Sequence, residues 1–210
     1  MPLLNRKQFL GREISRFRDA RLIIIATEGK DTEEQYFGSN LFNDSRIRLE
    51  IVPTNDNKSA PNHVLDRLKK HIRDNGLKLQ KDDQLWLMVD TDKWGKNLSE
   101  TCTEAKKKII NLAISNPCFE LWLYLHHSEP SSGWVYDINC KTIENNLRQK
   151  LGSYNKSNLD IEKFRDFVDD AIVRAKKMDT KSNNRWPQTP GTHVYKVVEE
   201  IKKIIQSNNK

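Results

Sequence analysis

The chain has 210 residues, of which 36% are hydrophobic and 31% are charged, a balance that can close a core and is too apolar for general disorder. No apolar run approaches the roughly 18 residues that a membrane helix needs, and the basic start of the chain lacks the apolar stretch and cleavage site of a secretory signal. The formal net charge of +7 suits a polyanionic partner such as nucleic acid, although many basic proteins bind none.

Alternating strands and helices are predicted over the first two-thirds of the chain. Residues 1–20 are polar and basic and are expected to form an arm before the sheet. Four short apolar segments have the composition of buried strands, namely 21–27, 48–52, 84–89 and 109–114. Helices are predicted to begin near four residues that follow these strands: Asp31, Pro61, Ser99 and Pro117. Such alternation predicts an α/β fold with a mostly parallel sheet flanked by helices.

The last third of the chain changes to a helical pattern. Its expected elements are a helix over 143–151, an amphipathic stripe over 161–175, a loose polar segment over 179–191 and a final helix capped by Thr192. From this change we predict an α/β domain over residues 21–128 and a C-terminal helical subdomain over residues 129–210 packed on it. The apolar stripes of the terminal helices suit a core or a homodimer equally well.

The three cysteines give no sign of a disulfide framework or a zinc module. Cys102, Cys118 and Cys140 are odd in number and never closely spaced. Because disulfides are rare in the reducing cytosol, we expect three reduced thiols in a cytoplasmic protein.

Acidic side chains follow two of the predicted strands. Glu28 follows the first strand, and Asp90 and Asp92 follow the third. Ligands of open α/β sheets collect at the carboxyl ends of the strands, so the three acids converge if these strands are neighbours. Carboxylate oxygens suit Mg²⁺ or Mn²⁺. Taken singly, such acids also cap helices or bond their own turns, but their joint position favours a metal site.

The same residues resemble the Toprim fold of topoisomerases, bacterial primases and related nucleases, which carries Glu-Gly after its first strand and Asp-x-Asp after a later one. Over nearly all of its length, the chain resembles more closely the RloB family, which is also known from abortive-infection systems. The segments that carry this resemblance are Thr27-Glu28-Gly29, Thr32-Glu33, Tyr36-Phe37, Val89-Asp90-Thr91-Asp92, Ser115-Asn116-Pro117-Cys118-Phe119-Glu120-Leu121-Trp122-Leu123, Tyr154-Asn155-Lys156, Arg174-Ala175-Lys176 and Gly191-Thr192-His193-Val194-Tyr195. The Asn-Pro-Cys-Phe-Glu-Leu-Trp block is the most specific of them.

The resemblance implies roles for four acids. It implies that Glu28 is the Toprim glutamate and that Asp90 and Asp92 are the metal-binding pair, and it suggests Glu120 as a fourth catalytic acid. The residues themselves leave two readings of Glu120 open, because an acid in the first turn of a helix also offsets the helix dipole. A charge set between apolar neighbours nevertheless needs a partner, which favours the site.

Four basic residues are candidates for holding a nucleic-acid backbone. Lys93 directly follows the acid pair and Lys156 lies in a polar loop, so both could contact phosphate or remain surface lysines. Arg174 and Lys176 belong to the helical region, where residues 146–185 hold ten Lys and Arg against six Asp and Glu. This surplus of positive charge favours contacts between the helical subdomain and the phosphates of a nucleic-acid backbone.

The helix that begins at Pro117 is expected to end at His126 and His127. Cations suit the negative end of the helix dipole. A structural role is therefore favoured for both histidines over a role in the site.

Together these features predict a metal-dependent nuclease that hydrolyses DNA or RNA. The chain has no Gly-x-x-x-x-Gly-Lys-Ser/Thr loop and is not expected to hydrolyse ATP itself. The resemblance further implies antiviral defence with a neighbouring ABC or SMC-like ATPase as partner, and transfer RNA as one plausible substrate. Two alternatives stay open: a non-catalytic module that keeps the Toprim shell to bind nucleic acid or a partner protein, and a nucleotidyl transferase of the primase kind.

Overall fold

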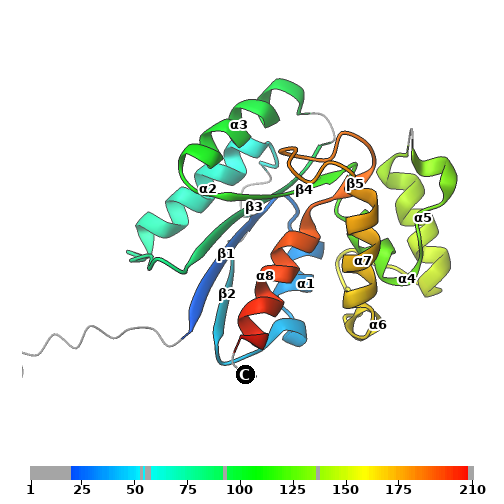
Figure 1. Ribbon diagram of the computed structural model, residues 1–210, viewed down its shortest axis with the longest axis horizontal. Coiled ribbons are helices and arrows are strands. Elements are labelled where there is room, and N and C mark those ends of the chain that lie inside the picture. Colours follow the sequence, from blue (N-terminus) through cyan, green and yellow to red (C-terminus); the bar gives the residue numbers. More distant parts are fainter. Residues whose placement is uncertain (1–19, 53, 55–57, 92–93, 136–137, 208–210) are drawn as a thin grey trace, which may run out of the picture.

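The protein is built around a five-stranded sheet (Figure 1). The computed structural model describes residues 20–52, 54, 58–91, 94–135 and 138–207. In spatial order the strands are β2 (Ile47–Val52), β1 (Arg21–Thr27), β3 (Gln84–Asp90), β4 (Asn111–Asn116) and β5 (Gly191–Thr192). The first four are parallel, and β5 is antiparallel to β4. The predicted α/β fold is therefore confirmed, and each of the four predicted strands lies within two residues of its expected bounds.

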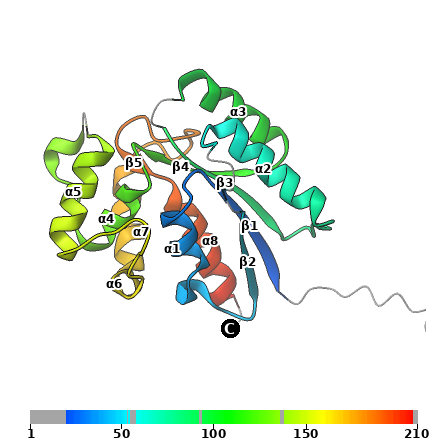
Figure 2. The ribbon, with the colours of Figure 1, turned by 180° about the vertical axis from the view of Figure 1, so that it is seen from behind.

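Helices cover both faces of the sheet (Figures 1 and 2). α2 (Pro61–Asp74) and α3 (Gly95–Lys107) pack on one face, and α1 (Thr32–Gly38) and α8 (Val194–Gln206) pack on the other. Successive strand residues point to opposite faces. The residues of β1 and β3 that pack with α2 and α3 are Leu22, Ile24, Ala26, Leu87 and Val89. Those that pack with α1 and α8 are Ile23, Ile25, Trp86 and Met88.

The remaining helices form a group beside α1 and α8. They are α4 (Glu120–His127), α5 (Cys140–Leu151), α6 (Glu162–Arg165) and α7 (Val168–Met178), with the 3-10 turn η2 (Ser132–Val135) between α4 and α5. Another 3-10 turn, η1 (Asn40–Phe42), follows α1 and leads into β2. α4 packs against both α5 and α7 and buries every residue up to its last. Its apolar side chains share one continuous core with α1, α8 and the sheet, so the apolar stripe of α8 lies inside the protein. Within the described residues, none of the helices combines the length and the apolar composition that spanning a membrane requires.

The amphipathic stripe over residues 161–175 does not form one helix. It divides into α6 and α7, because the N–H of Phe167 donates to the carbonyl of Phe164 at 3.0 Å and closes a tight turn between them. Phe167 is 41% exposed, although the stripe predicted it inside. The expectation of a single apolar face therefore holds for α7 but not for the turn before it.

The expectation that residues 179–191 are loose is wrong. Arg185 donates to the Ser99 carbonyl at 3.3 Å and to the Thr103 hydroxyl at 2.8 Å, both on α3. Asn116, at the end of β4, donates its side-chain N–H to the carbonyl of Pro187 at 3.0 Å. The segment then ends in β5, which pairs with β4. Polar contacts and the packing of Trp186 on the core under α2 and α3 therefore hold it in place.

His126 is a neutral core residue rather than a cation at a helix end. Its Nδ1 lies 2.9 Å from the carbonyl of Trp122 and its Nε2 lies 2.9 Å from the hydroxyl of Tyr36. Since a carbonyl only accepts, Nδ1 donates and Nε2 accepts from the tyrosine. Burial lowers the pKa of His126 to about 3, and burial also lowers the pKa of His127. Both histidines keep the predicted structural role. The prediction that they carry a charge that interacts with the helix dipole is wrong.

Candidate functional site

Glu28 and Asp90 lie together at the carboxyl ends of β1 and β3. These two strands are direct neighbours, with Thr27 opposite Met88, so the condition for convergence is met. The backbone N–H of Asp90 donates to Glu28 Oε2 at 3.0 Å, and the indole of Trp94 donates to Glu28 Oε1 at 3.3 Å. The Glu28 carboxylate is thereby fixed beside Asp90, as the position of the acids after neighbouring strands predicts.

Two of the predicted site residues, Asp92 and Lys93, lie outside the described residues. Their proposed roles in metal and substrate binding therefore remain predictions.

Glu33 is a further acid at this site that the sequence did not single out. It lies in the first turn of α1 and is 6% exposed. Its Oε1 accepts from the backbone N–H of Gly29 at 3.1 Å. A Cβ atom at position 29 would overlap the Glu33 carboxylate, so a larger residue here would displace that carboxylate. The Glu-Gly dipeptide with a glutamate four residues after the glycine is the sequence signal that could have revealed this acid.

Glu120 approaches the same site from the first turn of α4. It is 6% exposed, and its Oε1 lies 2.8 Å from Lys156 Nζ. Lys156 Nζ also lies 2.6 Å from Glu144 Oε1, on α5, so the ammonium bridges two carboxylates. The hydroxyl of Tyr154 donates to Glu120 Oε1 at 3.4 Å. Glu120 lies between apolar neighbours, and its charge is paired with Lys156. Lys156 is itself one of the predicted site residues.

These groups line one open pocket of about 350 Å³. Its walls come from the ends of β1 and β3, the start of α1, the start of α4 and the loop after α5. The lining residues are Glu28, Gly29, Lys30, Asp31, Thr32, Glu33, Ser59, Asp90, Cys118, Phe119, Glu120, Cys140 and Lys156. Larger hollows exist elsewhere on the described surface, but this one holds the strand-end acids.

The pocket favours the protonated forms of Asp90 and Glu33. Burial raises the pKa of Asp90 well above its usual range, and the carboxylates of Glu33, Glu28 and Glu120 raise it further. Burial likewise raises the pKa of Glu33 to about 7, with Glu120 and Glu28 adding to the effect. Among the described residues, no cation forms an ion pair with Asp90. A positive charge that enters beside Asp90 would relieve this repulsion.

The donor chemistry suits a hard divalent cation. Glu28, Glu33 and Asp90 supply oxygen atoms only, which Mg²⁺ and Mn²⁺ prefer. The two carboxylate oxygens of Glu28 accept N–H groups from Asp90 and Trp94. No group of three or more His, Cys, Asp or Glu side chains in the described part of the chain is already arranged around a metal position. The side chains therefore fit the ion in donor type, although they are not arranged around a metal position.

Two thiols sit at the edge of the acid group. All three cysteines are free, as expected. Cys118 is buried and Cys140 is half-buried, and both line the pocket. A hydrogen bond with Cys140, together with burial and the nearby charges of Glu120 and Asp90, raises the pKa of Cys118, so this thiol keeps its proton.

Arg174 and Lys176 do not line the pocket. Arg174 Nη1 donates to the carbonyls of Leu125 and His126 at 2.7 Å each, at the C-terminal end of α4. Lys176 Nζ lies 2.9 Å from Glu199, on α8. Both therefore have partners in the fold, and a role in binding substrate stays a prediction for each.

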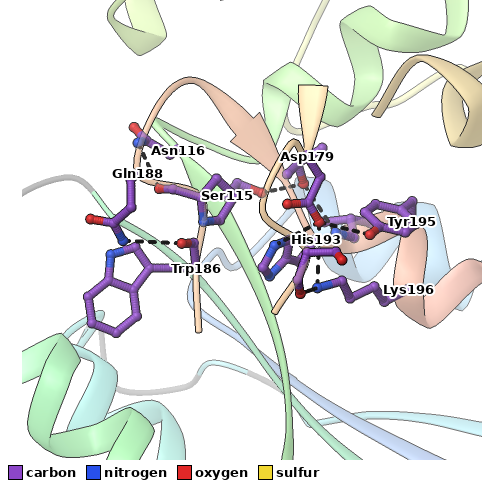
Figure 3. Close-up of polar contacts among 12 residues, drawn as sticks. Ser115, Asn116, Asp179, Trp186, Gln188, His193, Tyr195 and Lys196 are labelled. Atoms are coloured by element: carbon purple, nitrogen blue, oxygen red, sulfur yellow. Dashed lines mark hydrogen bonds and ion pairs between the residues drawn. The ribbon is translucent and has the colours of Figure 1, made fainter. Parts of the chain in front are cut away.

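A second buried carboxylate, Asp179, lies at the C-terminal end of α7 (Figure 3). Its side chain is 3% exposed. The Tyr195 hydroxyl donates to Asp179 Oδ2 at 2.8 Å. His193 Nε2 lies 3.1 Å from the same oxygen, although without hydrogen-bond geometry, and Lys196 Nζ lies 3.6 Å away. This cluster joins α7 to the start of α8 and is separate from the pocket acids.

The family model described as RloB-like protein matches residues 23–201 of the chain. This range includes the sheet, the pocket acids, the loop that carries Lys156 and most of α8. No curated protein and no solved structure shows a significant match.

Proposed function

Because the chain belongs to the RloB-like family, we propose that it is a Toprim-type nuclease that hydrolyses phosphodiester bonds with Mg²⁺ or Mn²⁺. One observation carries the proposal. Glu28, Glu33, Asp90 and Glu120 gather at one pocket at the carboxyl end of the parallel sheet, where like charges and burial raise the pKa of Asp90. Repulsion between these carboxylates lowers the stability of the folded protein, and a bound divalent cation would offset that loss.

Glu28 and Asp90 would hold the metal ion, with Asp92 as the predicted third ligand. When bound, the ion would polarise the scissile phosphate and lower the pKa of a bound water. Glu28 is already oriented by two N–H donors from Asp90 and Trp94. These bonds fix its carboxylate before any ligand arrives, which reduces the entropy lost on binding.

Glu33 and Lys156 are suited to the other tasks of hydrolysis. A carboxyl with a pKa of about 7 can hold or release a proton near neutral pH. The Lys156 ammonium is a compact positive charge at the pocket wall, where it can neutralise a phosphate oxygen. Glu120 contacts this ammonium at 2.8 Å, so its proposed contribution is to orient Lys156.

The proposed setting is antiviral or abortive-infection defence with an ABC or SMC-like ATPase partner. The family resemblance supports this setting. The net charge of +7 is compatible with DNA or RNA as the polyanionic substrate. Co-expression with the ATPase followed by affinity purification tests the partnership, and recovery of the nuclease chain alone under low and moderate salt would count against it.

The enzymatic proposal is tested by single-turnover cleavage of labelled transfer RNA, single-stranded DNA and duplex DNA, each with Mg²⁺, Mn²⁺ or EDTA. Asp90→Asn is expected to lower the metal-dependent rate by more than about 100-fold, because loss of a ligand should exceed the roughly 10–100-fold cost of losing an outer-shell partner. Asp82→Asn makes the same chemical change at an exposed acid and should cleave like the wild type. Equal rates for Asp90→Asn and wild type would overturn the assignment.

A further inference from the structure

The loop between α5 and α6 brings Lys156 to the pocket, and two side chains of α1 contact the backbone of this loop. The hydroxyl of Thr32 donates to the carbonyl of Lys156 at 3.5 Å, and Gln35 makes the shorter bonds. The amide of Gln35 donates from Nε2 to the carbonyl of Lys156 at 2.8 Å. Its Oε1 accepts from the backbone N–H of Leu159 at 2.7 Å. Gln35 thus uses both ends of its amide on the backbone of one loop, at Lys156 itself and three residues after it.

Further contacts restrict both partners. Gln35 Nε2 also donates to the carbonyl of Asp31 at 3.0 Å, within its own helix turn, so its rotamer is fixed from the helix side. On the loop side, the N–H of Ser157 donates to Asn155 Oδ1 at 3.0 Å and closes a turn around Lys156. The backbone of Lys156 is therefore held by α1, while its ammonium reaches Glu120 and Glu144.

Holding the backbone matters because a lysine side chain is long and flexible. Its four-carbon stem has several rotamers, and ordering it costs free energy. A displacement of about 1 Å at a reacting group can cost on the order of 100-fold in rate. The two carboxylates fix only the end of the side chain, whereas the two bonds from Gln35 fix its origin.

We propose that Gln35 is a positioning residue that sets the Lys156 ammonium at the pocket by holding the loop backbone from α1. The proposal rests on the proposed nuclease function for its catalytic consequence, but the placement of Lys156 by Gln35 is a property of the fold. Gln35 itself touches no reacting atom and acts through Lys156.

A double-mutant cycle tests the catalytic consequence. Gln35→Met keeps the length of the side chain and removes its hydrogen bonds to the backbone of Lys156 and Leu159. The control Gln206→Met makes the same change at the exposed end of α8. Gln35→Met is expected to lower kcat by about 10–100-fold, as loss of an outer-shell partner does, with KM for the nucleic acid changed far less. In a Lys156→Met background the same substitution should change kcat by less than about twofold. An equal loss in both backgrounds, or no loss in either, would overturn the proposal.

A labelling experiment tests the placement without any need for cleavage. Trace acetylation followed by mass spectrometry compares Lys156 with Lys107, an exposed lysine with no ion-pair partner among the described residues. Lys156 should label more slowly than Lys107 in the wild type, and Gln35→Met should speed its labelling by about tenfold, the change that corresponds to one pKa unit. Unchanged labelling in Gln35→Met would reject Gln35 as the residue that places Lys156. Faster labelling in a chain that cleaves nothing would keep the placement and reject the nuclease function.

Discussion

The Asp179 side chain is 3% exposed and Asp90 is half-buried in the pocket, and the two carboxylates have opposite kinds of neighbours. Asp179 receives a hydroxyl from Tyr195 and lies close to His193 and Lys196, so the chain supplies its own partners. Asp90 has Glu28, Glu33 and Glu120 as its charged neighbours. The contacts of Asp179 join α7 to α8, whereas the acids around Asp90 gather negative charge in an open pocket. The contrast supports the proposal that the pocket acids bind a cation from outside the chain.

The largest expected effect is on the Asp179 cluster. Asp179→Asn should lower the free energy of unfolding by about 3 kcal/mol, because it removes the charged acceptor of the Tyr195 hydroxyl and the carboxylate beside Lys196. Urea unfolding at neutral pH measures the change, with the exposed Asp82→Asn as the matched control. Asp90→Asn should leave the stability unchanged or raise it, since it removes repulsion. Similar losses for Asp179→Asn and Asp90→Asn would remove the contrast on which the account depends.

The pocket should also make stability depend on pH. Burial raises the pKa of Glu33 from 4.5 to about 7 in the folded protein, so between these values the folded state binds more protons than the unfolded state. The contribution of Glu33 to stability is therefore fully present below pH 4.5 and is lost as pH rises towards 7, by at most about 3 kcal/mol. Urea unfolding from pH 5 to 7.5 without divalent ions should show this loss in the wild type.

Glu33→Gln is the matched variant for that experiment, because it keeps the shape of the side chain and cannot titrate. Its stability should fall less over the same range. An identical pH dependence in both proteins would mean that Glu33 does not carry the buried proton.

A smaller effect is expected at Arg174, a predicted substrate ligand that the structure places at the end of α4. Arg174→Ala removes two hydrogen bonds to the carbonyls of Leu125 and His126 and should cost about 2 kcal/mol of stability. Measuring KM for the cleaved nucleic acid in the same variant separates the two roles. An unchanged KM assigns Arg174 to the fold, whereas a KM raised severalfold would support the predicted contact with substrate.

The parts of the fold that the sequence predicts are those in which one segment contains its own signal. The apolar runs of β1 and β3 and the stripe and opening proline of α2 identify these elements without help from distant residues. β5 has only two residues and exists through its pairing with Ser115 and Asn116 of β4, so no local pattern announces it. The turn at Phe167 was missed for a related reason, because apolar spacing does not reveal a break between two short helices.

The candidate site shows the same division. Glu28 and Asp90 were predictable because each directly follows a buried strand. Glu33 reads locally as an ordinary acid in the first turn of a helix, and its contact with the backbone N–H of Gly29 appears only in the folded structure. The partnership of Glu120 with Lys156 joins positions 36 residues apart across a loop, which spacing alone does not predict.

The most direct test of the central claim is calorimetric titration of Mg²⁺ and Mn²⁺ into the wild type, Asp90→Asn and Asp82→Asn. The account predicts that the wild type and Asp82→Asn bind the ions alike, and that Asp90→Asn binds them at least about tenfold more weakly. Equal affinity in Asp90→Asn, or no binding to the folded wild type, would contradict the claim that the pocket acids are gathered around a divalent cation.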